Sequence, residues 1–243
     1  MQKAIYQNNS GKSYSVIGNQ AQLFTETKAF QLWMDKLNPN IKMDYLELKD
    51  SFVIKNGTVM LFATVLGVNA SLNNKPISSY AFLRSDAVAM LPIITEIETG
   101  NAYTVVTEQF RFPYGDILFE CPAGMLDDET GFTGVAAKEI EEELHEKINM
   151  NRLIHLGTTV MSGGGCPERM HYVAFEMGKS KKELEAMKGR KTGAVLENED
   201  ITLHVLPFNS NAELISALMK LNPDLDAKIL VAITLWDNRL TDK

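Results

Sequence analysis

The chain has 243 residues, which is enough for one large domain or two modest ones. Its 45% hydrophobic and 23% charged residues support a sizeable core and are typical of an ordinary soluble protein. The formal net charge of -7 argues against nucleic acid or an anionic membrane as the main partner, because phosphate-rich surfaces attract basic proteins. A small anionic ligand held by a few local arginines and a metal ion is compatible with this charge.

The two cysteines, Cys121 and Cys166, are too few for a disulfide framework. They predict reduced thiols in a cytoplasmic protein. No basic stretch followed by an apolar run opens the sequence, so no signal peptide is expected. The longest apolar runs are too short to span a bilayer, so we expect no membrane partner.

The N-terminal third predicts a small α+β unit. Residues 1–20 are polar and are expected to form a loosely ordered end or an edge element. Apolar residues at helical spacing predict an amphipathic helix over Thr25–Leu37. Two β-like runs, Tyr45–Ile54 and Thr58–Val68, flank Asn56-Gly57, and this arrangement favours a hairpin.

Short strands separated by turns dominate the remainder of the chain. They are expected at Tyr80–Leu83, Ala87–Thr95, Ala102–Phe110, Ile117–Cys121, Leu153–Met161, His171–Glu176 and Ile201–Pro207. Helices are expected at Gly134–Ile148, Ser180–Lys188, Ala212–Leu221 and Asp226–Leu240. This pattern favours the α+β class, with helices packed against a mixed β-sheet. We predict an N-terminal extension over residues 1–78 and a main domain over residues 79–243.

The helix predicted at Gly134–Ile148 carries an apolar stripe and an acidic face. The stripe recurs every four residues, at Ala136, Ile140, Leu144 and Ile148. Glu139, Glu142 and Glu143 stand at positions i, i+3 and i+4, so they share one surface, and Glu146 is expected to continue it.

Two interpretations of this acidic face compete. It is either a solvated surface or a site for a hard cation such as Mg²⁺, which binds carboxylates, waters and substrate phosphate oxygens. The turn Cys121-Pro122-Ala123-Gly124 precedes the helix, and its glycine allows the backbone to approach a ligand closely. A carbonyl in this turn could join the carboxylates as a further ligand.

At these residues the chain resembles the Nudix hydrolases, whose signature is a glycine, a loop and a glutamate-rich helix. Gly124 and the run Lys138-Glu139-Ile140-Glu141-Glu142-Glu143 match that signature in spacing. Further segments are similar to the ADP-ribose and ADP-sugar pyrophosphatase branch, particularly the plant-type ADP-sugar diphosphatases. These segments are Glu108-Gln109-Phe110-Arg111, Pro122–Leu126, Ser162-Gly163-Gly164-Gly165-Cys166 and Glu197-Asn198-Glu199-Asp200-Ile201. The resemblance runs from about Phe24 to Trp236 and implies an α/β/α sandwich with a mixed sheet.

The sequence departs from the family signature at three positions. The earlier glutamate of the signature falls on Thr130 and its arginine falls on Lys138. These two positions mainly form an internal structural pair in the family, so the change of both leaves the metal ligands in place. The glycine that follows the helix falls on His145, and this suggests a longer final helical turn.

The resemblance implies Mg²⁺-dependent hydrolysis of an ADP-sugar, such as ADP-ribose or ADP-glucose, to AMP and a sugar phosphate, with Mn²⁺ as a substitute cation. It assigns the metal ligands to the Ala123 carbonyl, Glu139 and Glu143, supported by Glu142. Divalent ions there would neutralise phosphoryl charge and lower the pKa of the attacking water.

The resemblance also assigns roles to residues outside the metal-ligand set, and most of these residues have an alternative structural role. Glu168 matches a general base on a loop, or else it is a loop-surface residue that pairs with Arg169. Arg84 and Arg111 match phosphate or nucleotide contacts, for which a guanidinium suits two oxygens, or else they form structural ion pairs. Gly124 would border the substrate, and Met125 would line the sugar pocket or pack in the core.

Three further functions stay open on sequence alone. The chain could be a module that binds ADP-ribose or another nucleotide sugar without cleaving it. It could be a hydrolase of another nucleoside diphosphate derivative, such as a GDP-sugar, a UDP-sugar or a dinucleoside polyphosphate. It could also be a structural protein with an acidic helix. The resemblance also implies a homodimer in which the N-terminal segment reaches the partner's site.

Overall fold

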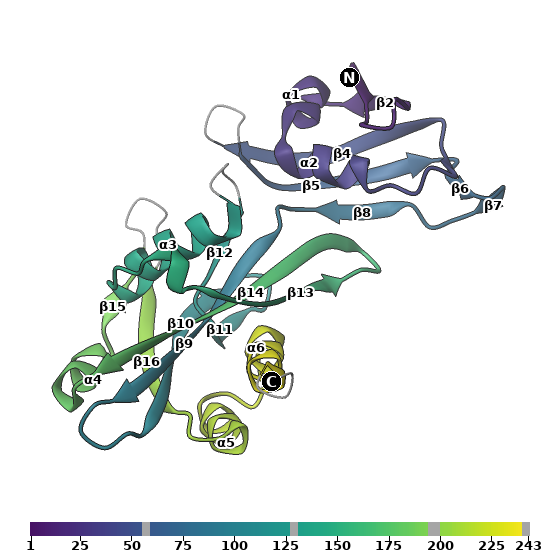
Figure 1. The fold of residues 1–243 in the computed structure, drawn as a ribbon. Coiled ribbons are helices and arrows are strands. Elements are labelled where there is room, and N and C mark those ends of the chain that lie inside the picture. Colours follow the sequence, from purple (N-terminus) through teal and green to yellow (C-terminus); the bar gives the residue numbers. More distant parts are fainter. Residues whose placement is uncertain (55–58, 127–130, 194–199, 240–243) are drawn as a thin grey trace. The chain divides into compact units, whose positions relative to one another are not determined.

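A computed structural model describes residues 1–54, 59–126, 131–193 and 200–239 (Figure 1). The chain divides into two compact units. The first unit comprises Met1–Asp86, Met125–Glu129 and Thr159–Met170, and the second comprises Ala87–Gly124, Thr130–Thr158 and His171–Lys243. The predicted domain division between residues 78 and 79 stays a prediction.

A five-stranded sheet in the order β1-β2-β4-β5-β8 forms the frame of the first unit. Its strands are β1 (Gln2–Gln7), β2 (Ser13–Gly18), β4 (Tyr45–Ile54), β5 (Val59–Val68) and β8 (Tyr80–Leu83). Strands β2 and β4 pair in parallel, whereas the other neighbours pair antiparallel, so the sheet is mixed. A smaller sheet contains β3 (Ile41–Lys42), β6 (Ser71–Leu72) and β7 (Lys75–Pro76).

Two helices, α1 (Ala21–Glu26) and α2 (Lys28–Asp35), provide the apolar cover of this sheet. Phe24 and Phe30 are fully buried with their ring centroids 4.6 Å apart. The amphipathic helix predicted over Thr25–Leu37 is present as α2, with Phe30 and Met34 buried, but its bounds were wrong because Thr25 belongs to the separate helix α1. Thr27 adopts an extended conformation, and its hydroxyl donates to the Phe24 carbonyl, so a local side-chain hydrogen bond replaces the continuous helix.

The N-terminal residues also differ from the first expectation. They form the β1–β2 hairpin, in which Ala4, Tyr14 and Val16 are buried in the core of the first unit. The expectation of a loosely ordered end was therefore wrong, and the alternative of an edge element is confirmed, because β1 is the outer strand of its sheet.

A larger sheet in the order β13-β14-β9-β10-β16-β15 frames the second unit, with β11 paired to β10 and β12 paired to β9. Its strands are β9 (Ala87–Glu96), β10 (Ala102–Arg111), β11 (Asp116–Glu120), β12 (Ala123–Met125), β13 (Ile154–Ser162), β14 (Cys166–Lys179), β15 (Lys191–Thr192) and β16 (Ile201–Pro207). The helices are α3 (Gly131–Leu144), α4 (Lys181–Met187), α5 (Asn211–Leu221) and α6 (Ala227–Asn238), and a 3-10 turn spans Met150–Arg152.

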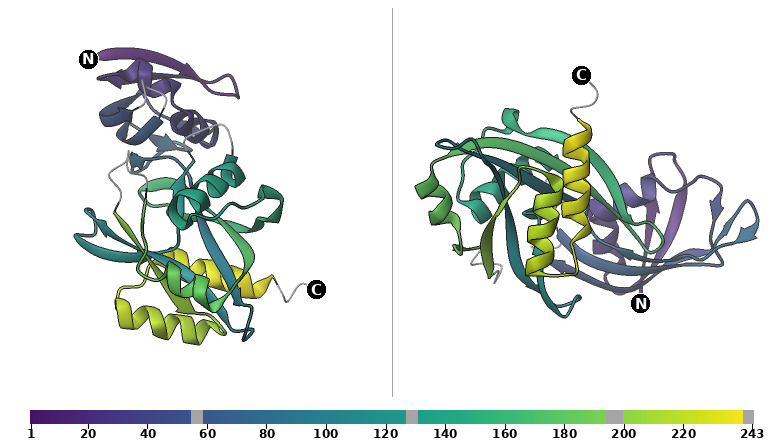
Figure 2. Two further views of the ribbon diagram at one scale, coloured as in Figure 1. Left: turned by 90° about the vertical axis from the view of Figure 1, so that its left-hand side faces the viewer. Right: turned by 90° about the horizontal axis from the view of Figure 1, so that it is seen from below.

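Helices cover both faces of the sheet in the second unit. Helix α3 packs on one face and α5 and α6 lie on the other (Figures 1 and 2). Strand β9 contacts both α3 and α6 and is buried along almost its whole length, as expected for a strand covered on both sides. The predicted α+β class with helices on both faces of a β-sheet is confirmed. Within the described ranges, no helix has the length and apolar character needed to cross a bilayer.

Several sequence predictions concern positions outside the described residues. These are the turn at Asn56-Gly57, the signature position Thr130, residues Glu197–Glu199 and the expected helix end at Leu240.

Candidate active site

The three glutamates of helix α3 at positions 139, 142 and 143 are not equally buried. Its predicted apolar stripe is confirmed at Ala136, Ile140 and Leu144, which are fully buried. Because Glu143 follows Ile140 by three residues, it lies at the border of that stripe and is only 5% exposed. Glu139 and Glu142 are both half-buried, and Glu142 pairs with Lys138 at 3.5 Å between Oε2 and Nζ.

The C-terminal end of α3 differs from the prediction in two ways. The helix ends at Leu144, not at Ile148, because His145 adopts a left-handed conformation with φ of 56°. A residue in this conformation closes many helices and is usually a glycine, so His145 keeps the backbone conformation of the signature glycine although it carries a side chain. The predicted longer final turn was therefore wrong. Glu146 lies beyond the helix and binds Lys179 at 2.6 Å, so it does not extend the acidic face.

Strand β12, which includes part of the predicted turn Cys121–Gly124, lies directly against one carboxylate. A Cβ atom at Gly124 would stand 2.4 Å from both Cγ and Oε1 of Glu139. Only a residue without a side chain fits there unless Glu139 moves, so the backbone of β12 and the Glu139 carboxylate form one surface. This contact accounts for the glycine that the sequence pattern places before the helix.

We expect Gly124→Ala to displace the Glu139 carboxylate while leaving the fold intact. The side chain of Glu139 is flexible enough to turn away, so the melting temperature should stay close to that of the wild type. The dissociation constant for Mg²⁺ should rise by about 10- to 100-fold, the usual cost of disturbing a ligand's surroundings. Calorimetric titration with Mg²⁺ checks this, and an unchanged dissociation constant would contradict it.

The donor chemistry of this surface fits a hard divalent cation. Carboxylate oxygens from Glu139, Glu142 and Glu143, with a carbonyl of the adjacent turn, are the ligand type that Mg²⁺ prefers. Among the described residues, no three His, Cys, Asp or Glu side chains form a complete cluster for a metal ion. Substrate phosphate oxygens and waters commonly supply the remaining ligands of such a cation.

A buried ionic network lies beside the same turn in the second unit. Glu120, whose side chain is 4% exposed, binds Arg111 Nε at 2.5 Å and Lys228 Nζ at 2.6 Å. Lys228 also lies 3.3 Å from Asp226, which caps the N-terminus of α6. Arg111 therefore forms the structural ion pair that was its alternative role, and a contact with substrate stays a prediction.

Charge and burial compete within this network. Burial disfavours the carboxylate of Glu120, yet Lys228 and Arg111 outweigh burial and hold its pKa below the usual range. Burial likewise opposes the ammonium of Lys228, but Asp226 and Glu120 raise its pKa. Burial raises the pKa of Asp226, and Lys228 offsets part of that effect. Each buried charge in the network therefore depends on its oppositely charged neighbours to stay ionised.

Cys121 connects the network to α3. Burial, reinforced by the negative charges of Asp226, Glu120 and Glu143, raises the pKa of its thiol. A thiol with a raised pKa is a poor nucleophile, so Cys121 packs as a small apolar group.

The first unit holds the predicted base and one predicted arginine. Glu168 lies in strand β14, not on a loop, and its Oε1 pairs with Arg84 Nε at 3.2 Å. Arg169 donates to the Oδ2 atom of Asp86 through Nε at 2.9 Å and Nη2 at 2.6 Å, and the alternative pairing of Glu168 with Arg169 stays a prediction. Met125 is half-buried in β12. The roles predicted for these residues stay predictions.

Glu120, Asp226 and Lys228 were not among the predicted site residues. Glu120 and Lys228 are 108 positions apart, so no local pattern joins them. The available signal was Lys228 itself, an isolated cation next to the apolar run Ile229–Trp236, preceded by an aspartate at a helix start.

Comparison with known proteins finds related sequences and solved structures of similar fold. Over 166 residues the chain is 34% identical to "Nudix hydrolase 14, chloroplastic" from Arabidopsis thaliana, covering 64% of this chain and 50% of that protein. It is 32% identical over 111 residues to a GDP-mannose pyrophosphatase from Pectobacterium atrosepticum, covering 43% of this chain and 52% of that protein. The chain thus spans about half the length of these relatives. No family model matches the chain.

A solved structure supports the fold assignment. A crystal structure described as an ADP compounds hydrolase superposes with a TM-score of 0.50 and 14% sequence identity, covering 83% of this chain and 97% of that chain. At this identity the likeness concerns the fold alone.

Proposed function

Because this chain is a homologue of the Nudix hydrolases, we propose that it hydrolyses the diphosphate of ADP-sugars, such as ADP-ribose and ADP-glucose, to AMP and a sugar phosphate. The observation that carries the proposal is the packing of Glu139 on the Gly124 backbone, beside Glu142 and Glu143 on the same helix. This arrangement joins oxygen ligands from two segments, as a divalent cation requires.

Each site residue has a defined task in this reaction. Ala123, Glu139 and Glu143 would hold Mg²⁺, with Glu142 in support and Mn²⁺ as a substitute. The metal, when bound, neutralises phosphoryl charge and lowers the pKa of coordinated water. Water attacks one phosphorus atom, the bond to the bridging oxygen breaks, and Glu168 accepts a proton. Arg84 and Arg111 would contact phosphate oxygens through the N–H groups outside their ion pairs, and Gly124 and Met125 would border the substrate.

The proposal extends to assembly and location. We expect a homodimer, and light scattering that shows a monomer at micromolar concentration would refute it. A cytoplasmic location agrees with the two free cysteines, because reduced thiols are typical of the cytosol. One relative carries the word chloroplastic in its name, so fractionation of the source cells is the direct measurement.

A second candidate is hydrolysis of a different nucleotide sugar, and the relative named as a GDP-mannose pyrophosphatase favours it. Base and sugar preferences depend on contacts outside the metal surface, so a shared helix is compatible with either substrate. A third candidate is a binding module that retains the nucleotide without cleaving it.

A panel of substrates separates these candidates. The protein is incubated with Mg²⁺ and ADP-ribose, ADP-glucose, UDP-glucose, GDP-mannose or a dinucleoside polyphosphate, and the released nucleotide is quantified. We expect AMP from the ADP-sugars at the highest rate. GMP from GDP-mannose as the main product would establish the second candidate. No release from any compound, with ADP-ribose still raising the melting temperature, would establish the binding module.

A further inference from the structure

The last turn of helix α3 carries Glu143 and needs partners for its carbonyl groups. The final carbonyls of a helix have no hydrogen-bond donor within the helix. The carbonyl of Glu141 accepts the His145 amide at 3.1 Å, as in other helices that close on a left-handed residue. The later carbonyls, including that of Leu144, depend on donors from elsewhere in the chain.

Arg190 supplies a donor for the Leu144 carbonyl. Its Nη1 atom donates to that oxygen at 3.4 Å, and its Nε and Nη2 atoms donate to the Ala186 carbonyl at 3.3 and 3.2 Å. Ala186 lies in the last turn of α4. One guanidinium group therefore joins the C-terminal ends of α3 and α4.

The backbone of Arg190 is itself held in place. Its amide donates to the Met187 carbonyl at 3.2 Å, and its carbonyl accepts the Leu203 amide at 3.0 Å. The Gly189 amide donates to the Leu203 carbonyl at 2.9 Å, and Leu203 is fully buried in β16. The guanidinium is therefore presented from a segment that is tied to the large sheet of the second unit.

The positive charge of Arg190 suits this position. In the described part of the chain, its side chain donates only to helix carbonyls. The C-terminal end of a helix carries a partial negative charge, which a cation stabilises. A second cation lies close to the same end, because Lys179 Nζ binds Oε1 of Glu146, two residues beyond the helix, at 2.6 Å. Two positive groups therefore hold the C-terminal end of α3.

The position of Glu143 depends on this helix end, because Glu143 directly precedes Leu144. The ends of helices fray, and fraying here would displace the Glu143 carboxylate. Glu143 is only 5% exposed, so its side chain has little room to compensate for a shift of its backbone. A metal ligand needs to be held within roughly 0.5 Å of its productive position.

We propose that Arg190 is a positioning residue for the metal site, which holds the Glu143 carboxylate in place by joining the ends of α3 and α4. This role rests on the proposed function, in which Glu143 is a metal ligand. Arg190 acts through the backbone of α3 and is not a ligand itself. Arg190 and Leu144 are 46 positions apart, so no local sequence pattern joins them.

Mn²⁺ binding measures the position of Glu143 without any substrate. Electron paramagnetic resonance separates free from bound Mn²⁺ and gives its dissociation constant. We expect Arg190→Gln to raise this constant by about 10- to 100-fold, the usual cost of losing a group that orients a metal ligand. Arg190→Lys should lie between Arg190→Gln and the wild type, because an ammonium keeps the charge but lacks the planar fork that reaches two carbonyls. An unchanged dissociation constant in Arg190→Gln would overturn the proposal.

Hydrogen exchange of the metal-free chain tests whether the effect is local. The His145 amide is bonded to a carbonyl of α3, so its exchange rate reports opening of the last helical turn. In Arg190→Gln this amide should exchange about two- to fivefold faster, as expected for the loss of a charge at a helix end. The amide of Ile140, one turn earlier, should keep its rate. Equal acceleration of both amides would mean a general loss of stability and would overturn the positioning role.

Lys191→Gln is the matched control for the loss of charge. Lys191 follows Arg190 in the chain and forms an exposed pair with Asp200 at 2.9 Å. An exposed pair contributes little, so the Mn²⁺ dissociation constant of Lys191→Gln should stay within about twofold of the wild type. A loss equal to that of Arg190→Gln would mean that the charge of this segment, and not the contact with Leu144, supports metal binding.

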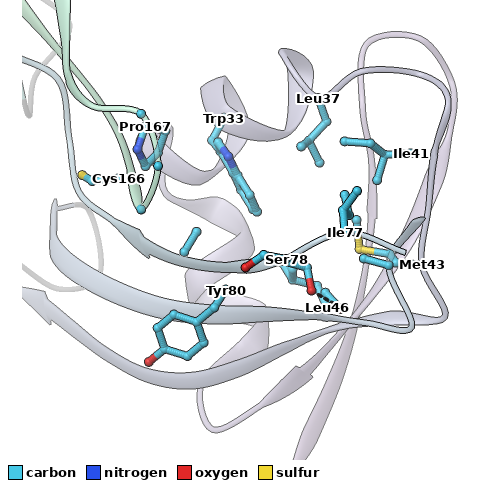
Figure 3. Close-up of a pocket in the computed structure, with 17 residues that line it drawn as sticks. Trp33, Leu37, Ile41, Met43, Leu46, Ile77, Ser78, Tyr80, Cys166 and Pro167 are labelled. Carbon is cyan, nitrogen blue, oxygen red and sulfur yellow. Dashed lines mark hydrogen bonds between the residues drawn. The ribbon is translucent and has the colours of Figure 1, made fainter. Parts of the chain in front are cut away.

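The two tryptophans show whether each variant is folded, because one lies in each unit. Trp33 lines a cavity of about 220 Å³ in the first unit, where its indole points toward the segment that carries Ser78 (Figure 3). Trp236 lies in α6 of the second unit. Should the emission show that Arg190→Gln is unfolded, Arg190→Lys replaces it, and wild-type Mn²⁺ affinity in Arg190→Lys would then overturn the proposal.

These measurements separate the positioning role from the proposed function. Weakened Mn²⁺ binding in Arg190→Gln, without hydrolysis of any nucleotide sugar by the wild type, would refute the proposed function and leave the positioning role standing. Hydrolysis of ADP-ribose by the wild type, with unaltered Mn²⁺ binding in Arg190→Gln, would refute the positioning role and leave the function standing.

Discussion

We expect Glu143→Gln to lower the rate of the proposed ADP-ribose hydrolysis on the order of 10²- to 10³-fold, the loss that follows removal of one group stabilising transition-state charge. Glu143 is the most buried of the three helix glutamates, so solvent could not replace it in the proposed role of metal ligand. Glutamine has the same shape and no charge, so the packing beside Ile140 and Leu144 is retained. Rates at saturating Mg²⁺, together with the melting temperature, measure the two effects separately.

The same helix supplies a matched control. Glu141 lies on the exposed side of α3, where it pairs with Lys147 at 3.2 Å. Glu141→Gln makes the same chemical change without touching the acidic face, and its rate should stay within about twofold of the wild type, because an exposed ion pair contributes little. Equal losses in both variants would mean that general helix charge, and not ligation, supports the activity.

The parts of the fold that could be predicted are those whose sequence repeats with the period of a strand or a helix. Strands β4, β8 and β16 have the predicted bounds, because their side chains repeat with the period of a strand. The two-residue strands β3, β6, β7 and β15 are too short to show any period. The break at Thr27 depends on one hydroxyl–carbonyl hydrogen bond within an otherwise helical pattern, so hydrophobic spacing alone could not reveal it.

The candidate site shows the same division between local and long-range information. Helix periodicity placed Glu139, Glu142 and Glu143 on one surface, and the structure adds their unequal burial. The partners of Arg84 and Arg111 depend on chain segments brought together by folding, and residue type alone gives no partner. The left-handed His145 also follows from tertiary context, since histidine enters that conformation far less readily than glycine.

The ionic network gives the C-terminal helix α6 a role in shaping the site. Glu120 ends β11, three residues before Ala123 begins β12, and its two carboxylate oxygens bind cations from β10 and α6. Lys228 therefore anchors the segment that leads into β12, although Lys228 has no predicted contact with substrate.

We expect the second large effect, a loss of stability, when the Lys228 side chain is replaced. Lys228→Met should reduce the free energy of unfolding by about 3–5 kcal/mol, because it leaves the buried Glu120 and Asp226 without their shared counter-charge. Urea denaturation followed by far-UV circular dichroism measures this loss. Lys228→Arg should retain most of the stability, since it keeps the charge.

The pH dependence of stability tests whether Lys228→Met is destabilised through the lost charge partner of Glu120. In the wild type the pKa of Glu120 is lowered, so its stabilising contribution is complete above the unfolded pKa of 4.5 and is lost as the pH falls through the lower folded pKa. Without Lys228 the folded pKa of Glu120 rises, so protonation of Glu120 at low pH costs less stability than in the wild type. We therefore expect the difference in stability between Lys228→Met and the wild type to be largest at neutral pH and to narrow as the pH falls through the pKa of Glu120. Adding Glu120→Gln should recover part of the stability at neutral pH, because it removes one unpaired buried charge. If the double variant were less stable by the sum of the two single losses, Lys228 would act through packing and not through Glu120.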